Sequence, residues 1–144
     1  MDIMYKRDGV SMLQDEIKKL YIAAVEMKLS GAALLLIDKA ATWCNGLGAE
    51  WMPGALRDLL SVLNPTLDPV VAIHDIRYEL GGTEQDRDFA DNEFKENGIK
   101  AAEYTYGWYN PLRYHVRHQA KKYHLLLTMF GAPAFNYKKE ETEC

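Results

Sequence analysis

Cysteine is scarce in this chain, whose 144 residues include only Cys44 and Cys144. Two cysteines cannot build the set of disulfides that a small secreted domain usually needs, so we expect a reducing compartment, or a particle assembled in one. Long apolar runs are also missing, since the longest, around residues 31–37, is far short of the roughly 20 residues of a membrane span. The N-terminal residues lack the basic start and the cleavage site of a signal peptide. The sequence therefore predicts neither export nor a transmembrane segment.

No basic excess runs through the chain, which carries a formal net charge of −4. Residues 41–110 sum to −7, and residues 111–144 sum to +3. A nucleic-acid-binding protein normally presents a basic face, so we expect no nucleic-acid partner. The composition, with 48% hydrophobic and 26% charged residues, is that of a globular protein and excludes disordered and collagen-like classes. At this length, one domain with one core is expected.

Strand-like alternation and internal repeats are absent, and helical signals occur in almost every segment. We expect helices over residues 11–29, 32–41, 69–80, 83–98 with an extension through Tyr104, and 112–130. Asp68 and Thr83 are the expected N-caps of the third and fourth helices, and Asn97-Gly98 is a natural C-cap. The predicted fold class is therefore all-α.

Apolar stripes run along the first and last helices. The first stripe consists of Leu13, Ile17, Leu20, Ala24 and Met27. The second consists of Leu112, Val116, Ala120, Tyr123, Leu127 and Phe130. Members of each stripe recur at steps of three or four residues, which is the spacing of one helix face. We expect the stripe of the last helix in the core, whereas that of the first helix suits either the core or a partner protein.

A tight helical hairpin at Gly81-Gly82 would bring two polar side chains together. His74 lies six residues before Leu80 and Asp91 lies six residues after Gln85, so the two should face each other across the pair. The same counting pairs Arg77 with Asp88, as a salt bridge. Tyr78 follows His74 by one helical turn and shares its face. A histidine oriented by a buried carboxylate, with a tyrosine hydroxyl nearby, is suited to act as a general base.

A calcium site is predicted beside this pair. Asp75 points about a quarter turn away from His74, toward another part of the molecule. The glycines of Gly46-Leu47-Gly48 allow consecutive backbone carbonyls to converge on one ion. Calcium prefers six to eight oxygen ligands and often combines carboxylates with backbone carbonyls.

Three motifs in this order resemble those of the phospholipase A2 superfamily. Residues 74–78, His-Asp-Ile-Arg-Tyr, match its H-D-x-x-Y signature. Residues 90–94, Ala-Asp-Asn-Glu-Phe, look like the A-D-x-x-F element of the parvovirus-type and phage or prophage members. Residues 44–48, Cys-Asn-Gly-Leu-Gly, are similar to the G-x-G calcium loop of the superfamily. The resemblance covers residues 44–135.

The resemblance implies calcium-dependent hydrolysis of the sn-2 ester of glycerophospholipids. His74 would match the base that deprotonates the attacking water, Asp91 the carboxylate that orients it, and Tyr78 the hydroxyl that supports both. Ca²⁺ would bind Asp75 and the carbonyls of Cys44, Gly46 and Gly48. The Gly46 backbone N–H would assist the ion at the oxyanion.

The resemblance also implies an organisation for the chain, as one globular unit. Residues 1–43 would form an N-terminal helical extension, 44–135 a phospholipase A2-like domain and 136–144 a charged tail. The chain departs from the family in lacking a disulfide framework, in having Ala49 where a glycine commonly follows the loop, and in the long interval after it. The expected location is cytoplasmic or virion-associated.

Other functions remain open from the sequence. A non-catalytic phage structural or ejection component could use the same scaffold and bind a virion or other phage protein through residues 11–29. Three histidines, His115, His118 and His124, suggest zinc, although no further ligand stands at a matching position. A phosphohydrolase of the H…HD…D type is disfavoured because no histidine precedes His74.

The last helix also carries a basic face. Arg113, Arg117 and Lys121 could contact a phospholipid membrane surface, or form an ordinary solvated face. The nearby aromatic residues Tyr104, Tyr106, Trp108 and Tyr109 fit either a membrane interface or the core.

Overall fold

The computed structural model describes residues 10–36 and 62–137, and within them the chain is all-α, as predicted. Its α-helices are α1 (Val10–Glu26), α4 (Asp68–Leu80), α5 (Glu84–Thr105) and α6 (Pro111–Phe130). Three short 3₁₀ helices accompany them, η2 (Ala32–Leu36), η3 (Pro65–Leu67) and η4 (Ala132–Ala134). The described residues form no strand, and their one β-type contact is an isolated bridge between Gly82 and Tyr137.

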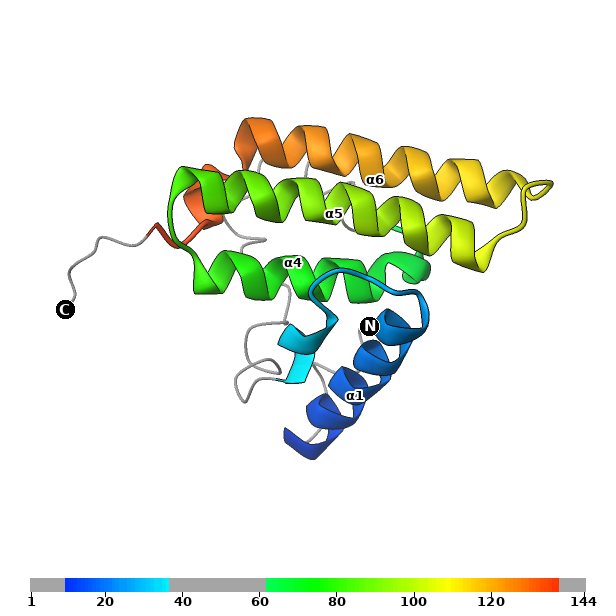
Figure 1. Cartoon of the computed structure of the whole chain (residues 1–144), viewed down its shortest axis with the longest axis horizontal. Helices are drawn as coiled ribbons and strands as arrows, with labels where there is room; N and C mark the ends of the chain where they lie inside the picture. Colours follow the sequence, from blue (N-terminus) through cyan, green and yellow to red (C-terminus); the bar gives the residue numbers. More distant parts are fainter. Residues whose placement is uncertain (1–9, 37–61, 138–144) are drawn as a thin grey trace.

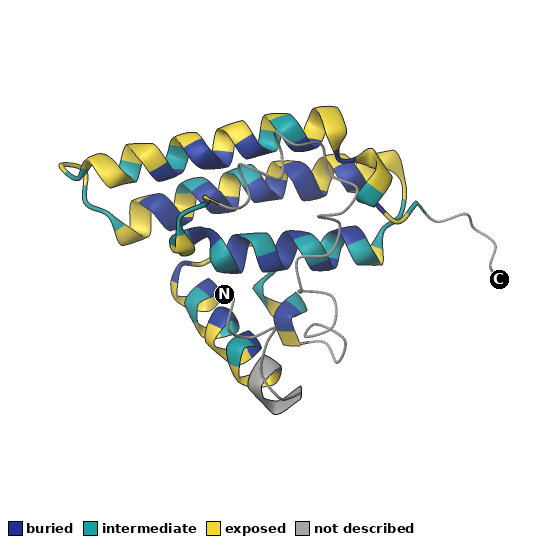
Figure 2. Cartoon of the chain, turned by 180° about the vertical axis from the view of Figure 1, so that it is seen from behind, coloured by how far each residue is buried: buried dark blue, intermediate teal, exposed yellow. Residues whose placement is uncertain are grey.

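The long helices α4, α5 and α6 lie side by side, and α1 crosses α4 at an angle on the side away from α6 (Figure 1). Figure 2 shows that the buried residues of the three long helices lie mainly on the sides that face one another. The predicted stripe of α1 is confirmed from Ile17 to Met27, and these side chains share one hydrophobic cluster with Ile73 and Ile76 of α4. Leu13 lies outside the described side chains. The α1 helix thus packs on the helix that carries His74.

The predicted stripe of α6 is correct in its middle and wrong at its ends. Val116, Ala120, Tyr123 and Leu127 are buried. Leu112 is 43% exposed and Phe130 is 37% exposed. Both residues lie in the terminal turns of α6.

Helix boundaries follow the expected capping residues only in part. Thr83 caps α5 in a capping box with Asp86, as expected of an N-cap. Asp68, however, is the first residue of α4 rather than its cap, because η3 precedes it and Asn64 caps that turn. The segment predicted as a helix over 32–41 is the 3₁₀ helix η2 where it is described, up to Leu36.

Gly98 does not end a helix, contrary to the prediction of a C-cap. The α5 helix continues without a break to Thr105. A Cβ atom on Gly98 would collide with Cβ of Ala120 on α6. The glycine therefore permits close contact between α5 and α6, and Asn97 is used as a buried hydrogen-bonding residue instead.

The turn between α4 and α5 is held by the end of the described chain. Gly81 and Gly82 have φ values of +67° and +137°, which favour glycine. The Gly82 N–H donates to the Asn136 carbonyl, and the Asn136 N–H donates to the Tyr78 carbonyl. This arrangement fixes the hairpin that positions the candidate site.

Candidate active site

His74 and Asp91 meet across the hairpin, as the spacing predicts. His74 Nε2 lies 3.0 Å from Asp91 Oδ1, and the two residues are only 6% and 3% exposed. The ring of His74 also packs edge-on against Phe94, with centroids 5.5 Å apart. The imidazole is therefore held both by a hydrogen bond and by packing.

Tyr78 joins this pair from the same face of α4. Its hydroxyl donates to Asp91 Oδ1 over 2.6 Å, and its ring lies 4.2 Å from that of His74. Burial and the neighbouring carboxylate both raise the pKa of Tyr78 far above its ordinary value. The hydroxyl consequently stays protonated and remains a donor to Asp91.

The hydrogen bonds of Asp91 define the chemistry of the imidazole. A carboxylate accepts, so Nε2 of His74 must carry the proton that lies between the two side chains. In the neutral imidazole, Nδ1 then carries the lone pair, and none of the described residues hydrogen-bonds to it. This is the tautomer in which Nδ1 can act as a general base.

Asp75 follows His74 but takes no part in this network. It is partly buried, and desolvation raises the pKa of its carboxyl well above its usual range, with a further increase from Glu79. Within residues 10–36 and 62–137 no cationic side chain pairs with it. Cys44, Gly46 and Gly48, the other predicted calcium ligands, lie outside the described residues.

Arg77 does not pair with Asp88, and that prediction is wrong. It makes a bidentate contact with Glu93, with two N–H···O distances of 2.9 Å, while Asp88 is exposed. Counting residues from the turn predicts which residues lie at the same level of the hairpin. It does not predict the direction in which each side chain points around its helix. Arg77 extends toward the η2 side, where Ser30 also donates to Glu93 over 2.6 Å.

Arg87 is a residue of the site that the sequence reasoning missed. It is 7% exposed, and its Nη1 lies 3.7 Å from Asp91 Oδ2 and donates to the Leu127 carbonyl of α6 over 3.2 Å. Its position four residues before Asp91 on a predicted helix is the signal that could have identified it.

The three histidines of α6 are the alternative candidates for a metal site. Among the described side chains, no three of the types His, Cys, Asp and Glu are grouped as a metal site. His124 instead lies 3.2 Å from Asn92, and its pKa is lowered by burial and by Lys95. His115 and His118 are exposed.

The predicted basic face of α6 is only partly free. Arg113 and Arg117 lie 3.8 Å and 3.7 Å from Glu103, whereas Lys121 is exposed.

The aromatic residues Tyr104, Trp108 and Tyr109 are 61%, 75% and 74% exposed, so core packing does not explain them. None of the helices in the described segments combines the length and the apolar character of a membrane span.

No protein-family model, curated protein or solved structure matches this chain.

Proposed function

We propose that this chain is a calcium-dependent hydrolase that cleaves the sn-2 ester of glycerophospholipids and has a phospholipase A2-like fold. The observation that carries the proposal is the buried cluster of His74, Asp91 and Tyr78 on two antiparallel helices. The motifs support the same reading, because the two residues that meet across the hairpin are those that match the family's H-D-x-x-Y and A-D-x-x-F motifs.

In this proposal, Nδ1 of His74 removes a proton from water as the water attacks the ester carbonyl. Asp91 keeps Nε2 protonated and stabilises the imidazolium that forms, and Tyr78 keeps Asp91 in place. The imidazolium then returns its proton to the leaving alkoxide oxygen of the lysolipid. A positioned base of this kind typically contributes about 10²–10⁴-fold in rate.

The donor chemistry of Asp75 fits a calcium ion, because it is a desolvated carboxylate that none of the described cations neutralises. Asp75 would hold the ion together with the carbonyls of Cys44, Gly46 and Gly48. When bound, calcium would polarise the ester carbonyl and stabilise the oxyanion. The N–H of Gly46 would donate to the same oxygen.

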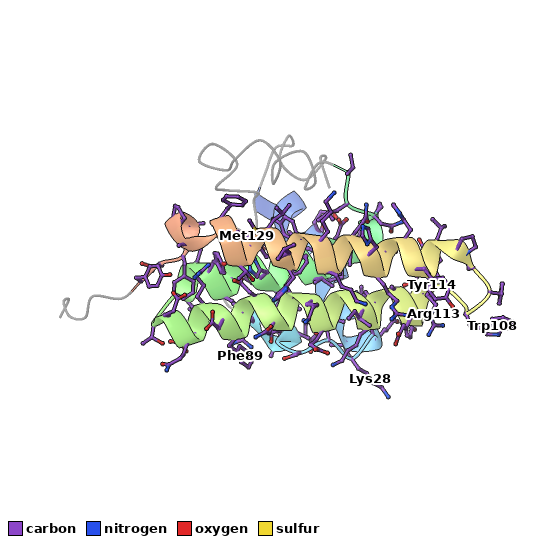
Figure 3. All side chains as sticks on the ribbon, turned by 90° about the horizontal axis from the view of Figure 1, so that it is seen from above. Lys28, Phe89, Trp108, Arg113, Tyr114 and Met129 are labelled. Carbon is purple, nitrogen blue, oxygen red and sulfur yellow. The ribbon has the colours of Figure 1, made fainter. Side chains whose placement is uncertain are left out.

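The proposed substrate lies in a membrane surface, and the outer face of α6 is suited to contact one. Every charged residue of α6 is basic, namely Arg113, Arg117, Lys121 and Lys122. Large side chains are exposed at both ends of this helix, including Trp108 beside its N-terminal end and Met129 near its C-terminal end (Figure 3). Lysines near an anionic membrane contribute about 1 kcal/mol each, so Lys121→Glu should weaken binding to anionic vesicles.

The test is the release of fatty acid from vesicles of anionic phospholipid. We expect release from the sn-2 position in millimolar calcium and none in chelator. Equal release in chelator would contradict the calcium requirement. If no fatty acid is released in calcium, the proposed hydrolase activity is wrong and the second candidate function is favoured.

That second candidate is a non-catalytic phage structural or ejection component that binds another protein through α1. Ile22 and Val25 favour it, because they are 55% and 48% exposed on this helix. Replacing both by glutamate should abolish such binding without affecting lipid hydrolysis.

A further inference from the structure

The two carboxylate oxygens of Asp91 have different partners. Oδ1 contacts both His74 and Tyr78, at 3.0 Å and 2.6 Å. Among the described residues, the partner of Oδ2 is Arg87, whose Nη1 lies 3.7 Å away. A carboxylate held at one oxygen can still rotate about its Cβ–Cγ bond, so the orientation of Asp91 depends on what holds Oδ2.

Arg87 is itself fixed from two directions. Its Nη1 donates to the Leu127 carbonyl of α6, and its Nε and Nη2 donate to the two oxygens of Glu84 over 3.2 Å and 3.0 Å. Tyr137 in turn donates to Glu84 over 2.6 Å. These bonds span three parts of the chain, so the guanidinium has a defined position that a mobile surface arginine would lack.

Because Arg87 is buried, its charge depends on these partners. A charged group as buried as Arg87 needs partners, because an unpaired charge in the interior is strongly unfavourable. Glu84 is mostly exposed, with a side-chain exposure of 58%, and so it can compensate only the outer side of the guanidinium. The inner side faces Asp91 and the Leu127 carbonyl.

We propose that Arg87 is a positioning residue of the candidate site. Anchored by Leu127 and Glu84, its guanidinium holds Oδ2 of Asp91 and so keeps Oδ1 directed at His74 and Tyr78. The catalytic consequence rests on the proposed function, whereas the effect on the His74–Asp91 contact does not.

Arg77 provides a matched control for this proposal. It also joins the helices of the hairpin through a carboxylate, Glu93, with two hydrogen bonds. It has no contact with Asp91. Arg77→Gln therefore removes an arginine–carboxylate pair of the same hairpin while leaving the partners of Asp91 unchanged.

The first measurement is the steady-state hydrolysis of phospholipid vesicles, at a temperature where each variant is folded. Arg87→Gln should lower kcat by about 10–100-fold with little change in KM, because it displaces a positioning group without touching substrate. Arg87→Lys should recover most of this loss, since lysine keeps the cation. Arg77→Gln should retain kcat within about twofold. A wild-type kcat in Arg87→Gln overturns the proposal.

The second measurement does not require activity. The Nε2 proton of His74, hydrogen-bonded to a buried carboxylate, should give a slowly exchanging downfield resonance in the ¹H NMR spectrum. We expect this resonance in the wild type, Arg87→Lys and Arg77→Gln, and its loss in Arg87→Gln. Its persistence unchanged in Arg87→Gln would overturn the proposal.

The two measurements separate this inference from the proposed function. If the wild type releases no fatty acid but the resonance depends on Arg87, the hydrolase proposal fails and the positioning role stands. If Arg87→Gln does not fold, Glu84→Gln tests the same chain of contacts at an exposed position. It should lower kcat and weaken the resonance, and wild-type behaviour in both would overturn the role of Arg87.

Discussion

Replacing Asp91 by asparagine tests whether a charged carboxylate organises the interior of the hairpin. The substitution keeps the shape of the side chain and removes its charge. Asp91 accepts two hydrogen bonds at Oδ1, from Tyr78 and from His74, and lies beside Arg87 at Oδ2. Hydrogen bonds to charged groups contribute about 1.5–3 kcal/mol, against about 0.5–1.5 kcal/mol for neutral ones, so each bond should lose about 1 kcal/mol.

Arg87 would also lose one of its two carboxylate neighbours, which brings the expected loss for Asp91→Asn to about 2–4 kcal/mol. At roughly 3 °C per kcal/mol for a chain of this size, the melting temperature should fall by about 6–12 °C. Thermal and urea unfolding followed by circular dichroism would measure both quantities.

Asp88→Asn is the matched control, because Asp88 lies on the same helix and is exposed. A surface substitution of this kind should change the free energy of unfolding by no more than about 0.5 kcal/mol. If Asp91→Asn proved as stable as Asp88→Asn, the buried network would contribute nothing and the reasoning would be refuted.

Three further substitutions test separate parts of the structure. Tyr78→Phe removes a 2.6 Å hydrogen bond to a buried carboxylate, so it should lower the free energy of unfolding in urea by about 1.5–3 kcal/mol. Tyr123→Phe is the control and should cost less, because the Tyr123 hydroxyl bonds none of the described residues. Equal losses in the two variants would argue against the Tyr78 bond. Folding raises the pKa of the Asp75 carboxyl, so the wild type loses stability as pH rises from the unfolded pKa toward the folded one. Asp75→Asn removes this loss, so it should raise the melting temperature at pH 7 in chelator. Below about pH 4 it should leave the melting temperature unchanged. A lower melting temperature for Asp75→Asn in chelator at pH 7 would count against a desolvated carboxylate. Gly98→Ala places a methyl group against Ala120. The overpacking should cost about 1–3 kcal/mol, partly offset by a gain in helix propensity of about 1 kcal/mol. Net stabilisation in urea would show that α5 and α6 can separate easily.

The sequence was sufficient to predict the four α-helices, though not all of their ends, and the contact between His74 and Asp91. Both depend on local rules, since apolar spacing identifies a helix face and a two-glycine turn fixes which residues of a hairpin stand at the same level. The Thr83 cap follows from an equally local rule. These rules act within one or two elements, so they need no knowledge of the other helices.

The errors arose where a third element decides the outcome. Gly98 reads as a helix end until Ala120 of α6 is placed against it. Arg77 is directed to Glu93 because Ser30 and η2 lie on that side. The i,i+4 spacing within α5 indicates that Arg87 pairs with Asp91, but the contact that anchors Arg87 to the Leu127 carbonyl depends on α6. Tertiary packing, not local propensity, selects among these alternatives.

The most direct test of the account is the rate of calcium-dependent fatty-acid release by His74→Ala on anionic phospholipid vesicles, compared with the wild type and with His115→Ala, an exposed histidine on α6. We predict that His74→Ala loses about 10²–10⁴-fold in rate and that His115→Ala retains the wild-type rate. Hydrolysis by His74→Ala at the wild-type rate would contradict the assignment of His74 as the base.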